Sequence, residues 1–232
     1  MTYDLSDGRV DQTGIVGNQI RRPDDLRVVD LLLKRALIPV LIALALVASA
    51  CGSDDPEPAV LAGIQRIPLP DVGELALPTT TGTDLAMQAD EDGLLLVYFG
   101  YTSCPDVCPT TMSDIRKALR ELGDDAERIS VAMATVDPER DTNDILDGYV
   151  KAFVDDGIAL RTEDDSLLRA SADVFGVTYS VSESDEGEIE VVHSGFLYAV
   201  DDQGLLQVTW PFGTPADDIL SDLEILLDQE TT

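Results

Sequence analysis

The chain has 232 residues, enough for one ordinary domain with additional segments. It carries 15 basic against 45 acidic residues, which gives a net charge of −30. A surface this acidic repels nucleic acids and anionic lipid head groups, which argues against a nucleic-acid partner. Because the acidic residues are scattered along the whole chain, they indicate a solvated acidic surface rather than a specific acidic binding site.

The N-terminal part has the pattern of a secretory signal. Lys34 and Arg35 precede an uncharged, mostly apolar stretch of 15 residues, 36–50. This stretch is too short for a comfortable membrane span and suits the apolar core of a signal peptide. It ends in small residues directly before Cys51, an arrangement that resembles a bacterial lipobox. We therefore expect lipidation at Cys51 and an anchor on the extracytoplasmic face of the cell membrane; the alternative is an uncleaved signal anchor.

The predicted organisation has three parts. Residues 1–50 are an N-terminal extension and lipoprotein signal peptide, residues 51–65 a flexible polar tether, and residues 66–232 a single domain. Residues 1–30 fit poorly as the start of a signal, because their acidic residues offset the basic ones. Either translation starts further downstream, or a cytoplasmic extension precedes the signal.

Hydrophobic patterning predicts the elements of the domain in chain order. A strand and turn are expected over residues 74–85, and the continuous apolar run 93–100, ended by glycine, predicts a buried central strand. The segment 109–122 begins with proline and repeats apolar residues at helical spacing, which predicts a helix. The remaining elements are expected as a strand over 128–137, a helix over 141–157, a strand over 157–162, a helix over 164–176, strands over 177–181 and 189–213, and a helix over 214–229.

Strand–helix alternation followed by an antiparallel hairpin and a closing helix indicates an α/β fold. We expect a central mixed sheet flanked by helices. In the helix over 141–157, Ile145, Tyr149 and Phe153 recur in phase and are expected on one face. Because a cysteine pair stands at the first major strand-to-helix junction, the thioredoxin-like fold is the natural candidate.

That cysteine pair lies in "GYTSCPDVCP", residues 100–109. With Cys51 assigned to the lipid, Cys104 and Cys108 are the remaining cysteines. Pro109 predicts that Cys108 is the N-cap of an exposed helix start, where the helix dipole favours a thiolate. The pair could be a structural disulfide, a redox dithiol or part of a soft-metal site.

His193, in "VVHSGFLYAV", is the only histidine of the chain. A lone histidine beside a strand is more often a partly buried polar residue than a ligand. On its own it therefore indicates no site.

Three segments together resemble the Sco/SenC family: "VYFGYTSCPDVCPTTM", "VDPERDT" and "HSGFLYAVDDQG". The resemblance covers about residues 66–228. It implies a thioredoxin-like copper-binding protein that helps assemble the copper centre of cytochrome c oxidase. It also implies that Cys104, Cys108 and His193 are copper ligands. Two thiolates suit Cu(I), and an added imidazole allows Cu(II). A structural zinc site normally needs four protein ligands, so a carboxylate would have to complete it.

Two positions near these segments leave questions open. The family commonly has an aspartate immediately before the histidine, where an acidic side chain could orient the imidazole or tune the site, whereas this chain has Val192. Asp137, in "VDPERDT", is expected either to tune the site or contact a partner, or to form a strand-end turn on Asp-Pro. Tyr98, Phe99 and Tyr101 are expected to pack around the site.

The resemblance and the candidate site residues together imply two alternative functions. The first is a copper metallochaperone that delivers copper to cytochrome c oxidase subunit II. The second is an extracytoplasmic thiol–disulfide oxidoreductase that reduces cysteines of that subunit or of another copper protein through Cys104 and Cys108. His193 favours copper, since a dithiol reductase does not require it. Strong self-repulsion between acidic chains predicts a monomer.

Overall fold

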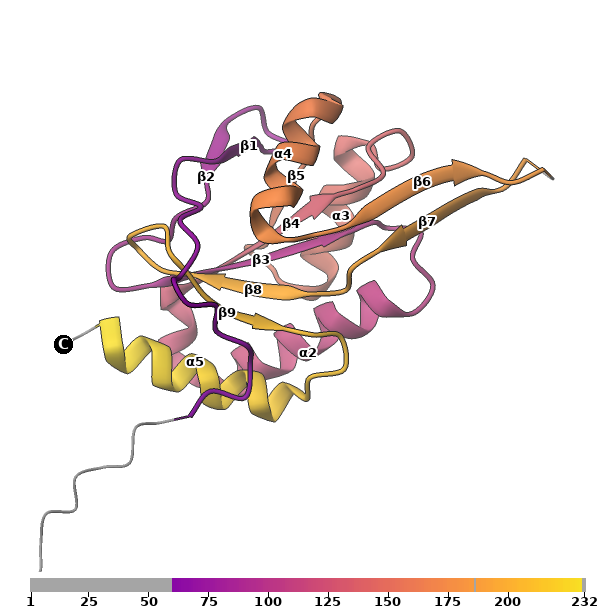
Figure 1. Cartoon of the computed structure of the whole chain (residues 1–232). Helices are drawn as coiled ribbons and strands as arrows, with labels where there is room; N and C mark the ends of the chain where they lie inside the picture. Colours follow the sequence, from indigo (N-terminus) through magenta and orange to yellow (C-terminus); the bar gives the residue numbers. More distant parts are fainter. Residues whose placement is uncertain (1–59, 186, 231–232) are drawn as a thin grey trace, which may run out of the picture. The chain divides into compact units, whose positions relative to one another are not determined.

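In the computed structural model, which describes residues 60–185 and 187–230, the centre of the domain is a five-stranded mixed sheet (Figure 1). Its strands lie in the order β5 (Ile158–Leu160), β4 (Ile129–Thr135), β3 (Leu94–Gly100), β8 (Leu197–Val200) and β9 (Leu206–Trp210). β3 pairs in parallel with β4, and β4 with β5, whereas β8 is antiparallel to both β3 and β9. The predicted central mixed sheet is confirmed. The predicted signal peptide and Cys51 lie outside the described residues.

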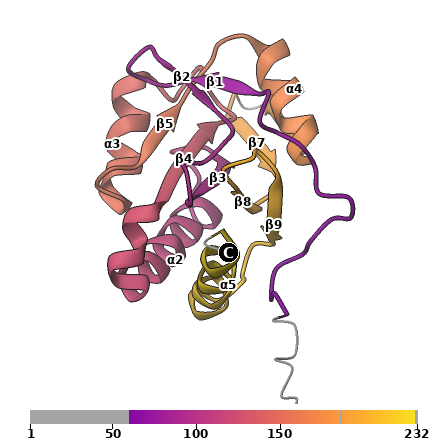
Figure 2. The ribbon, with the colours of Figure 1, turned by 90° about the vertical axis from the view of Figure 1, so that its left-hand side faces the viewer.

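Helices cover both faces of this sheet (Figures 1 and 2). They are α2 (Val107–Leu122), α3 (Asn143–Phe153), α4 (Asp165–Phe175) and α5 (Ala216–Glu230), with a short 3-10 helix η1 (Gly123–Arg128) after α2. α2 and α5 pack side by side on one face, and α4 lies on the other. Within the part of the chain that is described, none of these helices combines the length and apolar character needed to cross a membrane.

Strand β3 contributes to both layers because successive side chains point to opposite faces of a sheet. All seven of its residues are buried. The Phe99 ring packs against Phe175 of α4, with centroids 5.4 Å apart. Tyr98 points toward the face covered by α2, where Cys108 is one of its neighbours. The continuous apolar run therefore predicts the buried strand correctly.

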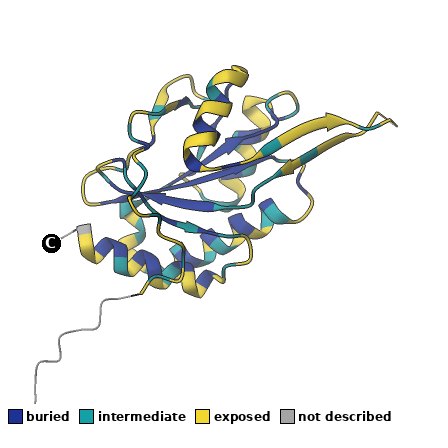
Figure 3. Cartoon of the chain, viewed as in Figure 1, coloured by how far each residue is buried: buried dark blue, intermediate teal, exposed yellow. Residues whose placement is uncertain are grey.

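Two small hairpins lie outside the central sheet. β1 (Ala76–Pro78) pairs with β2 (Asp84–Ala86), and β6 (Tyr179–Glu183) pairs with β7 (Ile189–His193), both antiparallel. The β6–β7 hairpin extends away from the sheet, and its outer part is largely exposed (Figures 1 and 3).

The helix predicted over 141–157 is present as α3, and the centre of its buried face lies beside the set of residues that recurs in phase. In α3 the fully buried residues are Leu146 and Val150, whereas Ile145 is 50% exposed. Tyr149 and Phe153 lie at the margin of the packed face, where their rings contact each other with centroids 5.3 Å apart. Smaller aliphatic side chains thus occupy the centre of the packed face of α3.

A buried carboxylate attaches the start of the domain to α5. Asp222, 1% exposed, accepts hydrogen bonds from the backbone N–H groups of Ala62 and Gly63 at 2.8 Å each and from Trp210 Nε1 at 2.7 Å. Ile64 then pairs with Thr209 beside β9. The chain is therefore held to the domain from residue 62 onward, inside the segment 51–65 that was predicted as a tether.

We expect Asp222→Ala to lower the free energy of unfolding by about 3 kcal/mol, because one buried and two partly buried donors lose a charged acceptor. Chemical denaturation measures the change. Glu224→Ala, an exposed position on the same helix, is the control and should change stability by less than about 0.5 kcal/mol. Equal effects of the two substitutions would contradict the role assigned to Asp222.

Candidate metal centre

The cysteine pair lies where β3 passes into α2. The first helical hydrogen bond runs from the N–H of Thr110 to the carbonyl of Asp106, so Asp106 is the N-cap and α2 begins at Val107. The predicted N-cap position of Cys108 is therefore wrong. Pro109 falls inside the first turn, where backbone N–H groups have no partner in the helix, so proline is tolerated there as well.

Both cysteines are free thiols and both are buried. Cys104 is 8% exposed and Cys108 is fully buried, so the predicted exposed helix start is wrong for these side chains. The two are directly connected, because the backbone N–H of Cys108 donates to Cys104 Sγ at 3.3 Å. The pair is thus a dithiol, with the sulfur of one residue solvated by the backbone of the other.

The two thiols differ in acidity. Burial acts to raise the pKa of Cys104, but hydrogen bonds from the backbone and side chain of Cys108 and from the backbone of Asp106 outweigh it, so this pKa lies below the ordinary value. Burial raises the pKa of Cys108 to about 12. Desolvation raises the pKa of Cys108 by more than the helix terminus lowers it, so Cys108 stays protonated. Cys104 is the more acidic thiol.

His193 is the last residue of β7, and its imidazole ring reaches the cysteine pair. Its Nδ1 lies 3.0 Å from the carbonyl oxygen of Ser194, which can only accept, so Nδ1 carries the hydrogen. Nε2 then presents its lone pair 3.5 Å from Cys108 Sγ. Burial lowers the pKa of His193, which favours the neutral imidazole that metals bind.

The structure thus brings the three predicted site residues together. One possible ligand atom each from Cys104, Cys108 and His193 lies within 4.8 Å of the others. Among residues 60–185 and 187–230 no further cysteine, histidine or carboxylate joins this group. Two sulfurs and one imidazole nitrogen suit a soft metal that accepts a low coordination number, whereas a structural zinc site would need a fourth protein ligand.

Two tyrosine rings surround the imidazole. Tyr101 and Tyr98 meet the His193 ring edge-on, with centroids 5.6 Å and 6.3 Å away. The expectation that these two residues pack around the site is confirmed. For Phe99 it is wrong, because its side chain points to the opposite face of the sheet, toward α4.

Gly100 leaves the space that the cysteine needs. A Cβ at this position would lie 2.6 Å from Tyr98 Cε1 and 3.0 Å from Cys108 Sγ. Both of those side chains are fully buried and have no room to move aside. The glycine that ends the apolar run is thus required by close packing at the site.

Val192 points away from the site. Its side chain is 68% exposed, as expected for a strand position next to the inward-facing His193. A side chain at this position cannot orient the imidazole directly, and the carbonyl of Ser194 does so here. The ring orientation therefore does not depend on an acidic residue at position 192.

Asp137 forms the predicted strand-end turn. Its carbonyl accepts from the N–H groups of Arg140 and Asp141, and its buried carboxylate pairs with Arg140. The Arg140 guanidinium lies 5.9 Å from the centroid of the Tyr101 ring, which in turn contacts His193. Asp137 is not in the Cys–Cys–His group, and it supports the site through this chain of contacts.

Asp141 is a site residue that the sequence analysis did not single out. Its fully buried carboxylate accepts from the backbone N–H of Thr102 at 3.0 Å and from the hydroxyls of Thr102 and Thr135 at 2.5 Å and 2.6 Å. It therefore fixes the loop that carries Cys104. The sequence could have indicated this residue, because Asp141 belongs to the segment "VDPERDT" that carries the family resemblance.

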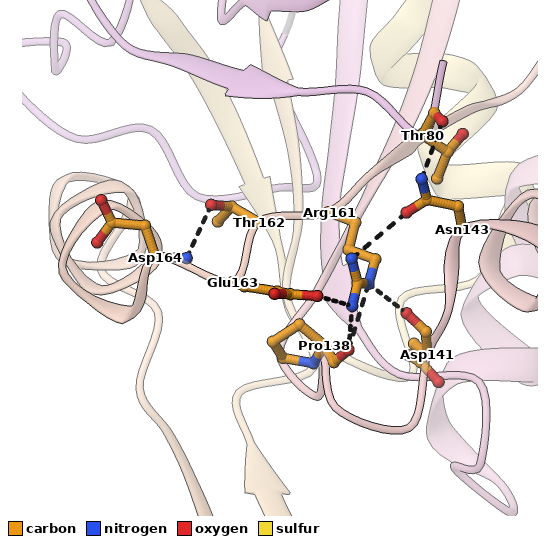
Figure 4. A network of polar contacts seen from close by, with 8 residues as sticks. All are labelled: Thr80, Pro138, Asp141, Asn143, Arg161, Thr162, Glu163 and Asp164. Atoms are coloured by element: carbon orange, nitrogen blue, oxygen red, sulfur yellow. Dashed lines mark hydrogen bonds and ion pairs between the residues drawn. The ribbon is translucent and has the colours of Figure 1, made fainter. Parts of the chain in front are cut away.

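The segment that holds Asp137 and Asp141 is itself clamped by Arg161, the residue that follows β5 (Figure 4). Arg161 donates through Nη2 to the carbonyl of Pro138 at 2.8 Å and through Nε to the carbonyl of Asp141 at 2.7 Å. The same guanidinium forms an ion pair with Glu163 at 2.6 Å. The support of the metal centre thus extends to the edge of the central sheet.

We expect alkylation of the copper-free protein to modify Cys104 well before Cys108. The pKa of Cys104 is lowered, so its thiolate fraction rises at a pH below that of an ordinary cysteine, whereas burial holds Cys108 as a thiol up to a pH of about 12. Iodoacetamide labelling followed by peptide mass mapping resolves the two sites. Preferential labelling of Cys108 would contradict the assignment.

We expect Gly100→Ala to destabilise the domain by about 1–3 kcal/mol, because the added methyl group overlaps Tyr98 and Cys108. Gly148→Ala is the matched control: this glycine is an exposed position inside α3 with open space around its Cβ, so alanine should stabilise the helix by about 0.5–1 kcal/mol. Urea denaturation of both variants measures the difference, and a neutral Gly100→Ala would refute the packing argument.

Comparison with known proteins places this site in a family. The SCO1/SenC family model matches residues 71–228. The chain is 37% identical over 113 residues to "SCO2-like protein RP587" of Rickettsia prowazekii, covering 48% of this chain and 55% of that protein. It is 33% identical over 141 residues to "Protein SCO1 homolog, mitochondrial" of Homo sapiens, covering 57% and 44%. The chain thus spans about half the length of the curated relatives it matches.

Solved structures agree with the fold. The apo Sco1 protein of Thermus thermophilus superposes with a TM-score of 0.64 at 30% identity, covering 75% of this chain and 99% of that chain. ScoI of Bradyrhizobium japonicum, solved with copper bound, gives a TM-score of 0.57 at 26% identity and covers 65% and 95%. The predicted thioredoxin-like fold is confirmed. With a family model matched over most of the domain, the chain belongs to the SCO1/SenC family.

Proposed function

We propose that this protein is a copper metallochaperone that binds Cu(I) and Cu(II) through Cys104, Cys108 and His193. The observation that carries the proposal is the convergence of two thiol sulfurs and a neutral imidazole nitrogen in one small group. This donor set suits copper in both oxidation states. Membership of the SCO1/SenC family and the copper-bound ScoI of Bradyrhizobium japonicum support it.

The proposed destination of the copper is subunit II of cytochrome c oxidase, following the role that the Sco/SenC resemblance implies. The buried site suits transfer by ligand exchange, because Cys104 is the less buried and more acidic thiol and can be replaced first by a thiolate of the acceptor. Lipidation at Cys51 would keep the domain on the extracytoplasmic face of the membrane, where it would act as a monomer.

A second candidate function is reduction of cysteines in the oxidase subunit or another copper protein. One observation favours it: an acidic thiol at Cys104 beside a buried thiol at Cys108 is the asymmetry of an attacking and a resolving cysteine. His193 has no necessary role in that reaction. Its position 3.5 Å from Cys108 Sγ is why we place copper carriage first.

We expect the purified protein to bind one copper ion per chain and, with Cu(II), to show thiolate-to-copper charge-transfer absorption. His193→Ala should lose much of this absorption and fail to support oxidase assembly in cells. The Cys104→Ser, Cys108→Ser double variant should fail in both assays. Val192→Ala, at an exposed neighbouring position, is the control and should behave like the unaltered protein.

The two candidate functions give different results in this experiment. If His193→Ala supports normal oxidase assembly while the double cysteine variant does not, the reductase function is correct. Retention of the full charge-transfer signal in His193→Ala would refute the three-ligand copper site.

A further inference from the structure

Strand β6 has a free edge beside the metal centre. In the described part of the chain it pairs with β7 in a two-stranded sheet and with no other strand. Hydrogen bonds close the hairpin at both ends, from the N–H of Ser194 to the carbonyl of Thr178 at 2.9 Å and from the N–H of Ser184 to the carbonyl of Glu188 at 2.8 Å. These bonds show that the backbone N–H and C=O groups of the even-numbered residues of β6 point toward β7.

The alternation of an antiparallel ladder then turns the backbone groups of Tyr179, Val181 and Glu183 outward. An outward row of N–H and C=O groups is a template for an additional strand. The edge starts at the metal centre, because Tyr179 lies directly opposite His193 in the register.

This edge borders a groove of about 770 Å³ between β6, α4 and the loop after β4. One wall is formed by residues of β6, namely Tyr179, Val181, Ser182 and Glu183. Leu168 and Arg169 of α4 form another. Val136, which also lines the groove, donates its N–H to the carbonyl of Gly100 at 2.9 Å. The groove is therefore lined by a residue that is hydrogen-bonded to the end of β3.

The charge of the groove indicates what kind of segment it fits. Its acidic lining residues are Asp137, Glu139, Glu163, Asp165 and Glu183, and its basic ones are Arg161 and Arg169. Both arginines are already in ion pairs, Arg161 with Glu163 at 2.6 Å and Arg169 with Asp165 at 2.8 Å. Asp137 is likewise paired with Arg140, so Glu139 and Glu183 remain without an ion pair among the described residues. The groove therefore keeps a negative charge that attracts a basic segment.

Apolar contact is available along the same wall. Val181 is 44% exposed and Ile189 is 39% exposed, and both line the groove. A strand laid on β6 would cover such side chains while its alternate residues reach the carboxylates.

We propose that this groove binds an extended, basic segment of the protein that receives the copper, added as a strand to the free edge of β6. The identity of this partner rests on the proposed function. A second copy of this chain is a poor occupant, because it brings Glu183 to the same edge and a net charge of −30.

We would test the proposal with the full-length protein and a labelled peptide of alternating lysine and valine, followed by fluorescence anisotropy. Val181→Pro removes an outward N–H of β6 and should weaken binding about tenfold. Val191→Pro is the matched control, because it lies opposite Val181 and removes an N–H from the other edge of the hairpin. It should bind the peptide as the unaltered protein does.

Peptide variants test the same idea without altering the protein. The alternating peptide N-methylated on every second amide keeps its charge but cannot pair with β6, and it should bind about tenfold more weakly. A glutamate–valine peptide should not bind. Equal binding of the methylated peptide, or equal loss in Val181→Pro and Val191→Pro, would overturn the proposal.

Sedimentation and copper binding separate the remaining outcomes. A dimer that Val181→Pro abolishes would show that a second copy occupies the edge, which would also overturn the proposal. Charge-transfer absorption of the Val181→Pro protein loaded with Cu(II) should be retained. Failure of copper binding in the unaltered protein refutes the proposed function, whereas failure of peptide binding with intact copper binding refutes this inference.

Discussion

The packing of Cys108 against the end of β3 is the constraint on which the metal centre depends. Its sulfur lies in space that only a glycine at position 100 leaves open, next to the buried Tyr98 ring. The same burial that secures the sulfur raises its pKa, so Cys108 keeps its proton when no metal is present. The dithiol is therefore asymmetric because of packing. Cys104, solvated by the N–H of Cys108, carries the negative charge first.

The third member of the site comes from an element outside the central sheet. His193 is 85 residues beyond Cys108, and the β6–β7 hairpin brings it back to the sulfur. Its ring is fixed by the Ser194 carbonyl and by the edges of two tyrosines. None of these contacts requires a charged neighbour, which explains how the site is formed with Val192 pointing into solvent.

Much of the fold could be predicted from the sequence because the elements are locally encoded. The apolar run of β3 and the glycine after α4, Gly176 with φ of 79°, mark their elements without tertiary information. The start of α2 and the acidity of its cysteines could not be predicted this way. They depend on how deeply the first turn is buried, and no local pattern reports burial. The role of His193 came from the family resemblance, since spacing alone does not reveal which hairpin folds back.

The segment "VDPERDT" joins the two halves of the site. Asp141 holds the loop of Cys104 through Thr102, and Asp137 holds Arg140 over Tyr101, which packs against His193. The free groove on β6 is bordered by this same segment, through Asp137 and its neighbours. A strand bound there would contact Asp137, which supports the imidazole, and Asp137 belongs to the same segment as Asp141, which supports the loop of Cys104. If that contact favours one arrangement of the loop, copper affinity and partner affinity must change by the same factor, because linkage between two sites on one protein is reciprocal.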